Sequence, residues 1–165
     1  MESCMIRVSR LTDYGLMLLV HIAAHPGRPM HTARDLASET ELPLPTVSKL
    51  LKALARAGIL TSHRGVAGGY GLARAARETT VADIVTALDG PIALTLCTEG
   101  AGRCDFEDAC PAHSKWQALN DAIRGAFESV TLADMAAPSG PRFVALGGLA
   151  AHPIAASPEP RRTRP

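Results

Sequence analysis

The sequence predicts a mainly α-helical protein in which a winged helix-turn-helix domain is followed by a long C-terminal helix. Three observations predict this class. Three amphipathic segments open the chain, with a short turn between the second and the third. A glycine-rich hairpin with two short strands follows them, and an isolated apolar seam at helical spacing lies near residue 120. Helix, helix, turn, helix and hairpin is the order of a winged helix-turn-helix domain.

Residues 11–24 form the first predicted helix, with Thr12 as its N-cap and "HPG" at 25–27 as its end. The second is short and spans residues 32–38. "TELPLP" then makes a turn, and Pro45 suits the first position of a third helix that ends near Ala57. Gly58 is a natural residue just beyond that end. The third helix places Val47, Leu50, Leu51 and Leu54 inward.

Two short strands are predicted at residues 59–64 and 70–73, with "GVAGG" as the tip of the hairpin between them. After this wing, Thr80 caps a helix over residues 81–89, and Gly90 closes it. We expect residues 6–80 to form the winged domain and residues 81–136 a second region. The proline-rich segment 137–165 has no long apolar periodicity and is predicted to be a disordered tail.

A longer helix is predicted from about residue 112 to residue 130. Its apolar residues follow a narrow seam typical of a coiled coil rather than a broad core face: Trp116, Leu119, Ile123, Phe127 and Val130. The seam lies outside the winged domain, and its apolar side chains must be buried against another part of the chain or against another protein. Pairing with a second copy is favoured over packing back on its own domain, so we expect a homodimer.

Charge and composition narrow the function. Residues 1–80 carry ten lysines and arginines against six acidic residues, whereas residues 81–137 carry three against nine. This asymmetry supports a nucleic-acid-binding front half. No apolar run is long enough to span a membrane, and the first residues lack the features of a signal peptide. We therefore expect a cytoplasmic protein. No catalytic motif is present, which argues against an enzyme.

The third helix and the wing hold the candidate DNA-binding residues. In a helix-turn-helix protein the second helix of the motif enters the major groove of double-stranded DNA. Its outward side chains can read base edges or contact phosphates. The predicted set is Thr46, Ser48, Lys49, Lys52 and Arg56 on the helix, with Arg64, Gly65, Gly68 and Gly69 at the wing. The alternative is that these cations are simply solvated.

"LTLCTEGAGRCDFEDACPAHSKW", residues 94–116, contains three of the four cysteines. Their spacing is C-x6-C-x5-C. In a cytoplasmic protein a disulfide is disfavoured. A structural zinc site usually has tighter cysteine pairs than these. A redox cofactor and simple packing both remain open on the residues alone.

Four segments resemble a known family: "RLTDYGLMLLVHIA", "VSKLLKALARAGILTSHRGVAGGYGLA", "VADIVTALDGPIALTLC" and "VTLADM". They are similar to the iron–sulfur-sensing winged-helix transcription regulators, the Rrf2-type group of IscR and NsrR. The resemblance covers residues 6 to about 136. Within the group, "GPIALTLC", "CDFEDACP" and "VTLADMA" most resemble the regulator of the SUF iron–sulfur assembly operon.

The resemblance implies a homodimer with an iron–sulfur cluster, expected to be 2Fe-2S, in the loop before the dimerisation helix. Cys97, Cys104 and Cys110 match the ligating cysteines. His113, nearest in sequence, is the first choice for a fourth ligand, and Asp13 is the second because it matches an aspartate that serves from the partner subunit in NsrR. A non-protein ligand is the third choice.

The resemblance also carries over to the DNA-reading residues. Arg64 matches the wing arginine, and Thr46, Ser48 and Lys49 fall in the base-reading stretch. Ser48 departs from the pattern because it replaces a glutamate that tunes site selection in IscR. Switching between two classes of DNA site is therefore in doubt.

The predicted function is a DNA-binding repressor of iron–sulfur assembly genes that senses cluster status or oxidative stress. A nitric-oxide sensor is the main alternative among regulators. A zinc-stabilised adaptor that binds no DNA and a cluster carrier are the alternatives from other classes.

Overall fold

The computed structural model describes residues 8–65 and 68–138, apart from the side chain of Asp108. It confirms a mainly helical fold with one two-stranded antiparallel sheet. Of the predicted tail, residues 137–165, all but the first two residues lie outside the described residues. So do the two residues at the tip of the wing, 66 and 67.

Three helices open the fold: α1 (Arg10–Ala24), α2 (Ala33–Thr40) and α3 (Leu44–Arg56). The predicted cap of α1 is wrong. Ser9 is the N-cap, and its side chain accepts a hydrogen bond from the Thr12 amide at 3.2 Å. Thr12 lies one turn into the helix, and its side chain is buried. The third helix begins one residue before Pro45, and Gly58 adopts the predicted left-handed conformation after it.

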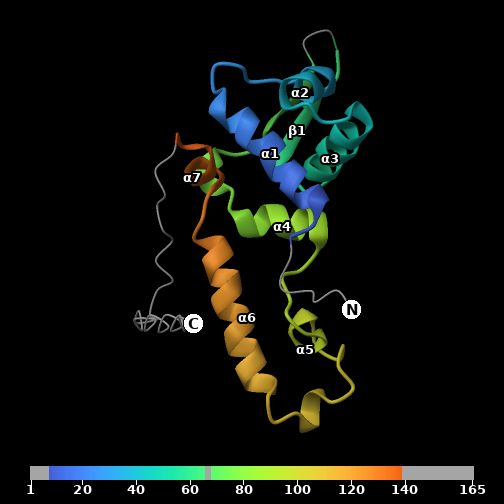
Figure 1. The fold of residues 1–165 in the computed structure, drawn as a ribbon, viewed down its shortest axis with the longest axis vertical. Coiled ribbons are helices and arrows are strands. Elements are labelled where there is room, and N and C mark those ends of the chain that lie inside the picture. Colours follow the sequence, from blue (N-terminus) through green and yellow to red (C-terminus); the bar gives the residue numbers. More distant parts are fainter. Residues whose placement is uncertain (1–7, 66–67, 139–165) are drawn as a thin grey trace, which may run out of the picture.

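The wing consists of β1 (Leu60–His63) and β2 (Gly69–Leu72), each shorter or shifted by a residue from its predicted range. Leu60 pairs with Leu72, and His63 pairs with Gly69. The connector between α1 and α2 adds an isolated bridge to this sheet, between His31 and Tyr70. The wing is thus anchored on one side by the chain that links the first two helices (Figure 1).

One core holds these elements together. The inward residues predicted for α3, Val47, Leu50, Leu51 and Leu54, are all buried. They pack in one cluster with residues of four other helices: Leu18, Leu19 and Ile22 of α1, Leu36 of α2, Ile84 of α4 and Leu132 of α7. The last two residues come from segments beyond the predicted domain boundary at residue 80.

The second half of the chain begins with the 3₁₀ turn η1 (Ala76–Glu78) and helix α4 (Val81–Asp89). The predicted cap of α4 is confirmed. Thr80 and Asp83 form a reciprocal capping box, and Gly90 ends the helix with φ +94°. Helix α7 (Leu132–Ala136) closes the fold. It packs against α1 and η1, and Leu132 donates its amide hydrogen to the Thr79 carbonyl at 2.8 Å.

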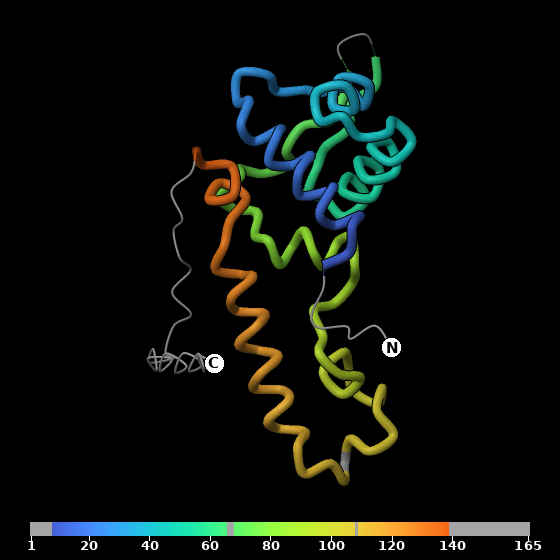
Figure 2. Tube along the Cα trace, in the orientation of Figure 1, coloured from blue at the N-terminus to red at the C-terminus, as the bar shows by residue number. Residues whose placement is uncertain are grey.

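Residues 91–128, which we call the cysteine arm, leave the winged domain between these two helices. The arm descends through the short helix α5 (Leu96–Glu99) and the turn η2 (Glu107–Ala109), then returns along α6 (His113–Glu128). Figure 2 shows the descending segment and α6 as two limbs of one projection. The predicted cysteine loop therefore contains a helical turn at its first cysteine. Among the described residues, no helix is long and apolar enough to cross a membrane.

Candidate functional site

Helix α3 presents a polar outer face because its other face is fully used by the core. Lys49, Lys52 and Arg56 are exposed, whereas Thr46 and Ser48 are half-buried. All five predicted residues of this helix therefore have at least part of their surface toward solvent. The arrangement suits a helix whose buried face fixes its position while its long cationic side chains reach outward.

The wing lies beside this face. A recess of about 280 Å³ is lined by Lys52, Ala55 and Arg56 of α3 together with Ser62 and Tyr70 of the strands. Ser62 and Tyr70 were not predicted as site residues. The two residues pair across the hairpin, and only that register places them together.

The glycines of the wing have a packing reason of their own. Gly65 has φ +118°, a conformation that favours glycine. At Gly69 an added Cβ would lie 2.6 Å from the His31 carbonyl oxygen, so this position must be glycine for the connector to pair with β2. Gly68 is equally crowded by the His63 carbonyl oxygen, at 2.4 Å. Contact with a phosphate is therefore not needed to explain Gly68 and Gly69.

The electrostatics separate two groups of cations. Across residues 8–65 and 68–138, the ion pairs engage His21 and five arginines: Arg28, Arg74, Arg77, Arg103 and Arg124. Lys49, Lys52, Arg56 and Arg64 take part in none of them. An exposed cation without a carboxylate partner is free to neutralise a phosphate. Lys49, Lys52, Arg56 and Arg64 are thus available for phosphate contacts, as are Arg10 and Arg34, which are also exposed and outside these ion pairs.

The three cysteines of the arm are free thiols in the structure. Cys97, on α5, is buried with 6% of its surface exposed, and its sulfur lies 3.1 Å from the Thr95 hydroxyl oxygen. Cys104 and Cys110 are half-buried in the loop that follows. In the described part of the chain, their sulfurs do not form a group of three ligand atoms within 4.8 Å of one another.

His113, the predicted fourth ligand, is the first residue of α6. Its Nδ1 is buried and has no hydrogen-bond partner among the described residues. A buried polar atom without a partner is unusual and calls for an explanation, such as an absent ion. Helix α6 also begins without a side-chain cap at Ala112. The positive end of its dipole is therefore directed toward the cysteine segment.

Polar side chains of α6 hold the cysteine segment in place. Gln117 donates from Nε2 to the Cys97 carbonyl oxygen at 2.7 Å. Asn120 is buried; it donates from Nδ2 to the Ile92 carbonyl oxygen at 3.1 Å and accepts from the Leu94 amide at 3.0 Å. The backbone of the first cysteine is thus tied directly to α6.

Asp13, the alternative ligand, lies far from this loop in the sequence. It lines an apolar groove of about 560 Å³ between α1, α4 and α6. The groove also contains most of the predicted seam: Leu119, Ile123, Phe127 and Val130. Trp116, the first seam residue, is 39% exposed and does not line it. The structure therefore brings Asp13 to the seam rather than to Cys97.

The chain is similar to known transcription regulators over most of its length. Residues 8–138 match the Rrf2 family, described as iron-dependent transcriptional regulators. A protein of Mycobacterium tuberculosis strain H37Rv, named as an HTH-type transcriptional regulator, is 31% identical over 85% of this chain and 87% of its own length.

Two solved structures share the fold. The structure of CymR, the global cysteine regulator of Bacillus subtilis, aligns with a TM-score of 0.67 and 28% identity over 82% of this chain and all of that chain. The structure of T. potens IscR aligns with a TM-score of 0.59 and 32% identity over 79% of this chain and 85% of that chain. The family match over residues 8–138, the 31% identical relative and the shared winged fold show that the chain belongs to the Rrf2 family of DNA-binding transcriptional regulators.

Proposed function

We propose that this regulator is a cytoplasmic homodimer that represses iron–sulfur assembly genes, the SUF system foremost, and senses cluster status or oxidative stress. A 2Fe-2S cluster would be held by Cys97, Cys104, Cys110 and His113. The observation that carries the proposal is the buried, unpartnered Nδ1 of His113 next to a segment with three free thiols.

The donor set fits such a cluster. Thiolates are the usual ligands of iron–sulfur clusters, and imidazole replaces some of them in centres of higher potential. The uncapped start of α6 favours the negative charge that three thiolates bring. Among the described residues the three sulfurs are not all within 4.8 Å of one another, so the loop would have to close further around either a zinc ion or a cluster. When bound, the cluster supplies iron that reacts with oxidants and can be lost.

The groove between α1, α4 and α6 supports the homodimer. It is lined almost entirely by apolar side chains, among which Leu119 is 48% exposed and Met135 is 43% exposed. Such a surface in a single chain marks an interaction site. A second α6 presents the same apolar seam and is the occupant we propose. Asp13 at this groove would then lie near the partner subunit.

Hydrogen bonds and packing connect the cysteines to the DNA-binding face. Gln117 and Asn120 fasten the cysteine segment to α6, and α6 packs against α4. Helix α4 in turn packs against both α1 and α3. A change in the loop would therefore shift α6 at the dimer interface and alter the separation of the two α3 helices. Half-site spacing on DNA depends on that separation.

The test compares cluster-loaded and cluster-free protein on the DNA upstream of its own gene. Anaerobic reconstitution should give the parent protein a visible absorption band. The Cys104→Ala variant should show no such band after the same treatment. The two forms of the parent should differ in DNA affinity, whereas Cys104→Ala should bind alike before and after reconstitution. No absorption in the parent, or equal affinities for its two forms, would refute cluster sensing and leave the family assignment intact.

Exposure of the loaded protein to peroxide and to nitric oxide then separates the two signals. A response to peroxide at lower dose supports the proposed regulator of assembly genes. A response confined to nitric oxide would replace it with the nitric-oxide sensor.

A further inference from the structure

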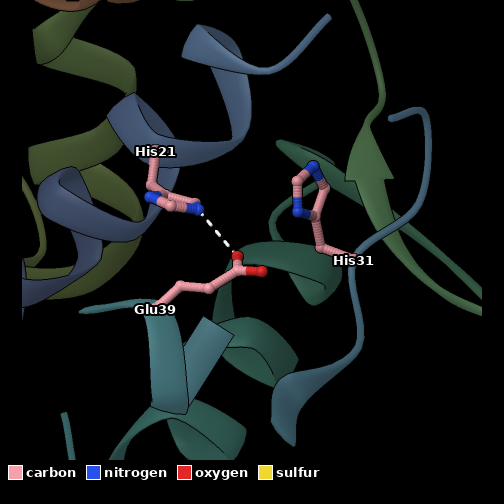
Figure 3. Close-up of side chains that lie close together, drawn as sticks. All are labelled: His21, His31 and Glu39. Carbon is pink, nitrogen blue, oxygen red and sulfur yellow. Dashed lines mark hydrogen bonds and ion pairs between the residues drawn. The ribbon is translucent and has the colours of Figure 1, made fainter. Parts of the chain in front are cut away.

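A second group of metal-ligating side chains lies in the winged domain, away from the cysteines. His21, near the end of α1, Glu39, near the end of α2, and His31, in the connector between them, bring their ligand atoms within 4.8 Å of one another. His21 Nε2 lies 2.8 Å from Glu39 Oε2. Figure 3 shows the His31 ring beside this pair. No spacing of histidines and acidic residues along the chain points to this group, because the three residues meet only through the fold.

His31 is the unusual member. Its side chain is buried, with 1% of its surface exposed, and neither ring nitrogen makes a well-aligned hydrogen bond among the described residues. The nearby Arg28 backbone has only a small raising effect on the pKa of this ring. A buried imidazole normally donates from one nitrogen and accepts at the other. Burial, together with the charge of Arg28, lowers the pKa of His31, so its ring is neutral at neutral pH. A neutral imidazole is the form that binds a metal.

The charge around the group also suits a cation. Arg28 donates from Nη1 to Glu39 Oε1 at 2.8 Å, which leaves Oε2 facing His21. Arg28 is also paired with Asp35. One positive guanidinium is therefore paired with two negative carboxylates, which leaves a net negative charge on these three groups. Hydrogen bonds from His21 and Arg28 lower the pKa of Glu39, which keeps its carboxyl group ionised.

We propose that His21, His31 and Glu39 form a binding site for a divalent transition-metal ion, with Zn²⁺ as the preferred occupant. Two imidazoles and one carboxylate are a recognised zinc ligand set, with water in the fourth position. Zinc bonds of about 2.1 Å at tetrahedral angles hold ligand atoms about 3.4 Å apart. His21 and Glu39 would therefore separate slightly as the ion replaces their hydrogen bond.

The site joins three parts of the domain. Besides α1 and α2, it reaches the wing, because the His31 amide donates to the Tyr70 carbonyl at 2.9 Å and the Tyr70 amide donates to the His31 carbonyl at 2.8 Å. An ion bound to the His31 ring would hold this residue in place. Its binding should therefore slow hydrogen exchange at the amides of His31 and Tyr70.

The test uses the full chain with its four cysteines, Cys4 included, replaced by serine, so that the cysteine arm cannot take the metal. Zn²⁺ is titrated in competition with a chromophoric chelator, and Co²⁺ is used as a spectroscopic probe. The expected result is one ion per chain with the visible bands of tetrahedral cobalt. Amide exchange at His31 and Tyr70 should slow on addition of Zn²⁺.

His21→Gln and Glu39→Gln should each weaken Zn²⁺ binding by at least about tenfold. Both residues are partly exposed, so these variants keep the core intact. His63→Gln, which changes an exposed histidine of β1 outside the group, is the control and should bind Zn²⁺ like its parent. The proposal would be overturned if the parent did not bind Zn²⁺. It would also be overturned if the His21→Gln and Glu39→Gln variants bound Zn²⁺ with the same affinity as the parent.

Discussion

The winged domain and the cysteine arm are built on opposite principles. In the winged domain and the two helices packed on it, α4 and α7, residues from five helices fill one core, and Leu18, Leu51 and Leu54 have no exposed surface. In the arm, Phe106 is 74% exposed and Leu96 is 59% exposed, while the only buried side chains of residues 91–128 that the structure describes are Cys97 and Asn120. The apolar side chains that stabilise the winged domain are therefore buried inside it. The arm leaves large apolar side chains exposed to solvent.

This difference agrees with the proposal that the arm is the part of the protein that senses a signal. Elements with few buried apolar contacts open at lower free energy than a packed core. A regulator that must read a signal and still hold a fixed DNA-binding face benefits from this division (Figure 1). The core fixes α3, and in the function that we propose a cluster and a second chain would order the arm.

The largest expected effect comes from the core. Leu51→Ala should lower the free energy of unfolding by about 2–5 kcal/mol, since it removes a fully buried side chain and leaves a cavity. Leu96→Ala, the matched change in the arm, should cost less than about 1 kcal/mol because most of that side chain is exposed. Urea denaturation of both variants measures the difference. Equal losses would contradict the division between core and arm.

The apolar groove between α1, α4 and α6, where we propose that a second copy binds, provides the next test. Ile123→Asp places a charge in the apolar groove and should raise the dimer dissociation constant by about a hundredfold or more, equivalent to about 2.7 kcal/mol. Asp121→Asn, a change at an exposed position on the same helix, should leave the constant unchanged. Sedimentation equilibrium gives both values. A monomeric parent would contradict the proposed homodimer.

A smaller effect is expected within the arm. Asn120→Ala removes the two hydrogen bonds that tie residues 92 and 94 to α6, at a local cost of about 1–2 kcal/mol. Hydrogen exchange at the Leu94 amide should accelerate, while exchange in α3 stays unchanged. Ser114→Ala, an exposed change on α6, is the control. Faster exchange across the winged domain would show that the two regions unfold together.

The smallest effect concerns pH. Burial alone would raise the pKa of Asp89, but hydrogen bonds from the Ser9 hydroxyl at 2.6 Å and amide at 3.1 Å outweigh it and lower that pKa. A carboxyl with a lowered pKa stabilises the fold above its unfolded pKa, and that stability is lost as the pH falls through its folded pKa. The stability difference between the parent and Asp89→Asn should therefore shrink in acid. A constant difference would exclude this contribution.

The parts of the fold that could be predicted are those set by local pattern. The inward face of α3, the cap at Thr80 and the wing follow from spacing and turn residues. Ser9 was missed as a cap because Thr12, also a capping residue type, lies close by. The packing of α7 against α1 and the grouping of His21, His31 and Glu39 could not be predicted, because both depend on contacts between residues far apart in the sequence. The DNA contacts and the cluster ligands remain predictions.

Hydrogen exchange of the full chain, with and without an anaerobically reconstituted cluster, tests the central claim most directly. We expect slower exchange in residues 94–116 and at the start of α6 when the cluster is bound, with the α3 core unchanged. Equal exchange in the arm of both forms, or slowing confined to the winged domain, would contradict the proposal that the cysteine arm is the sensor.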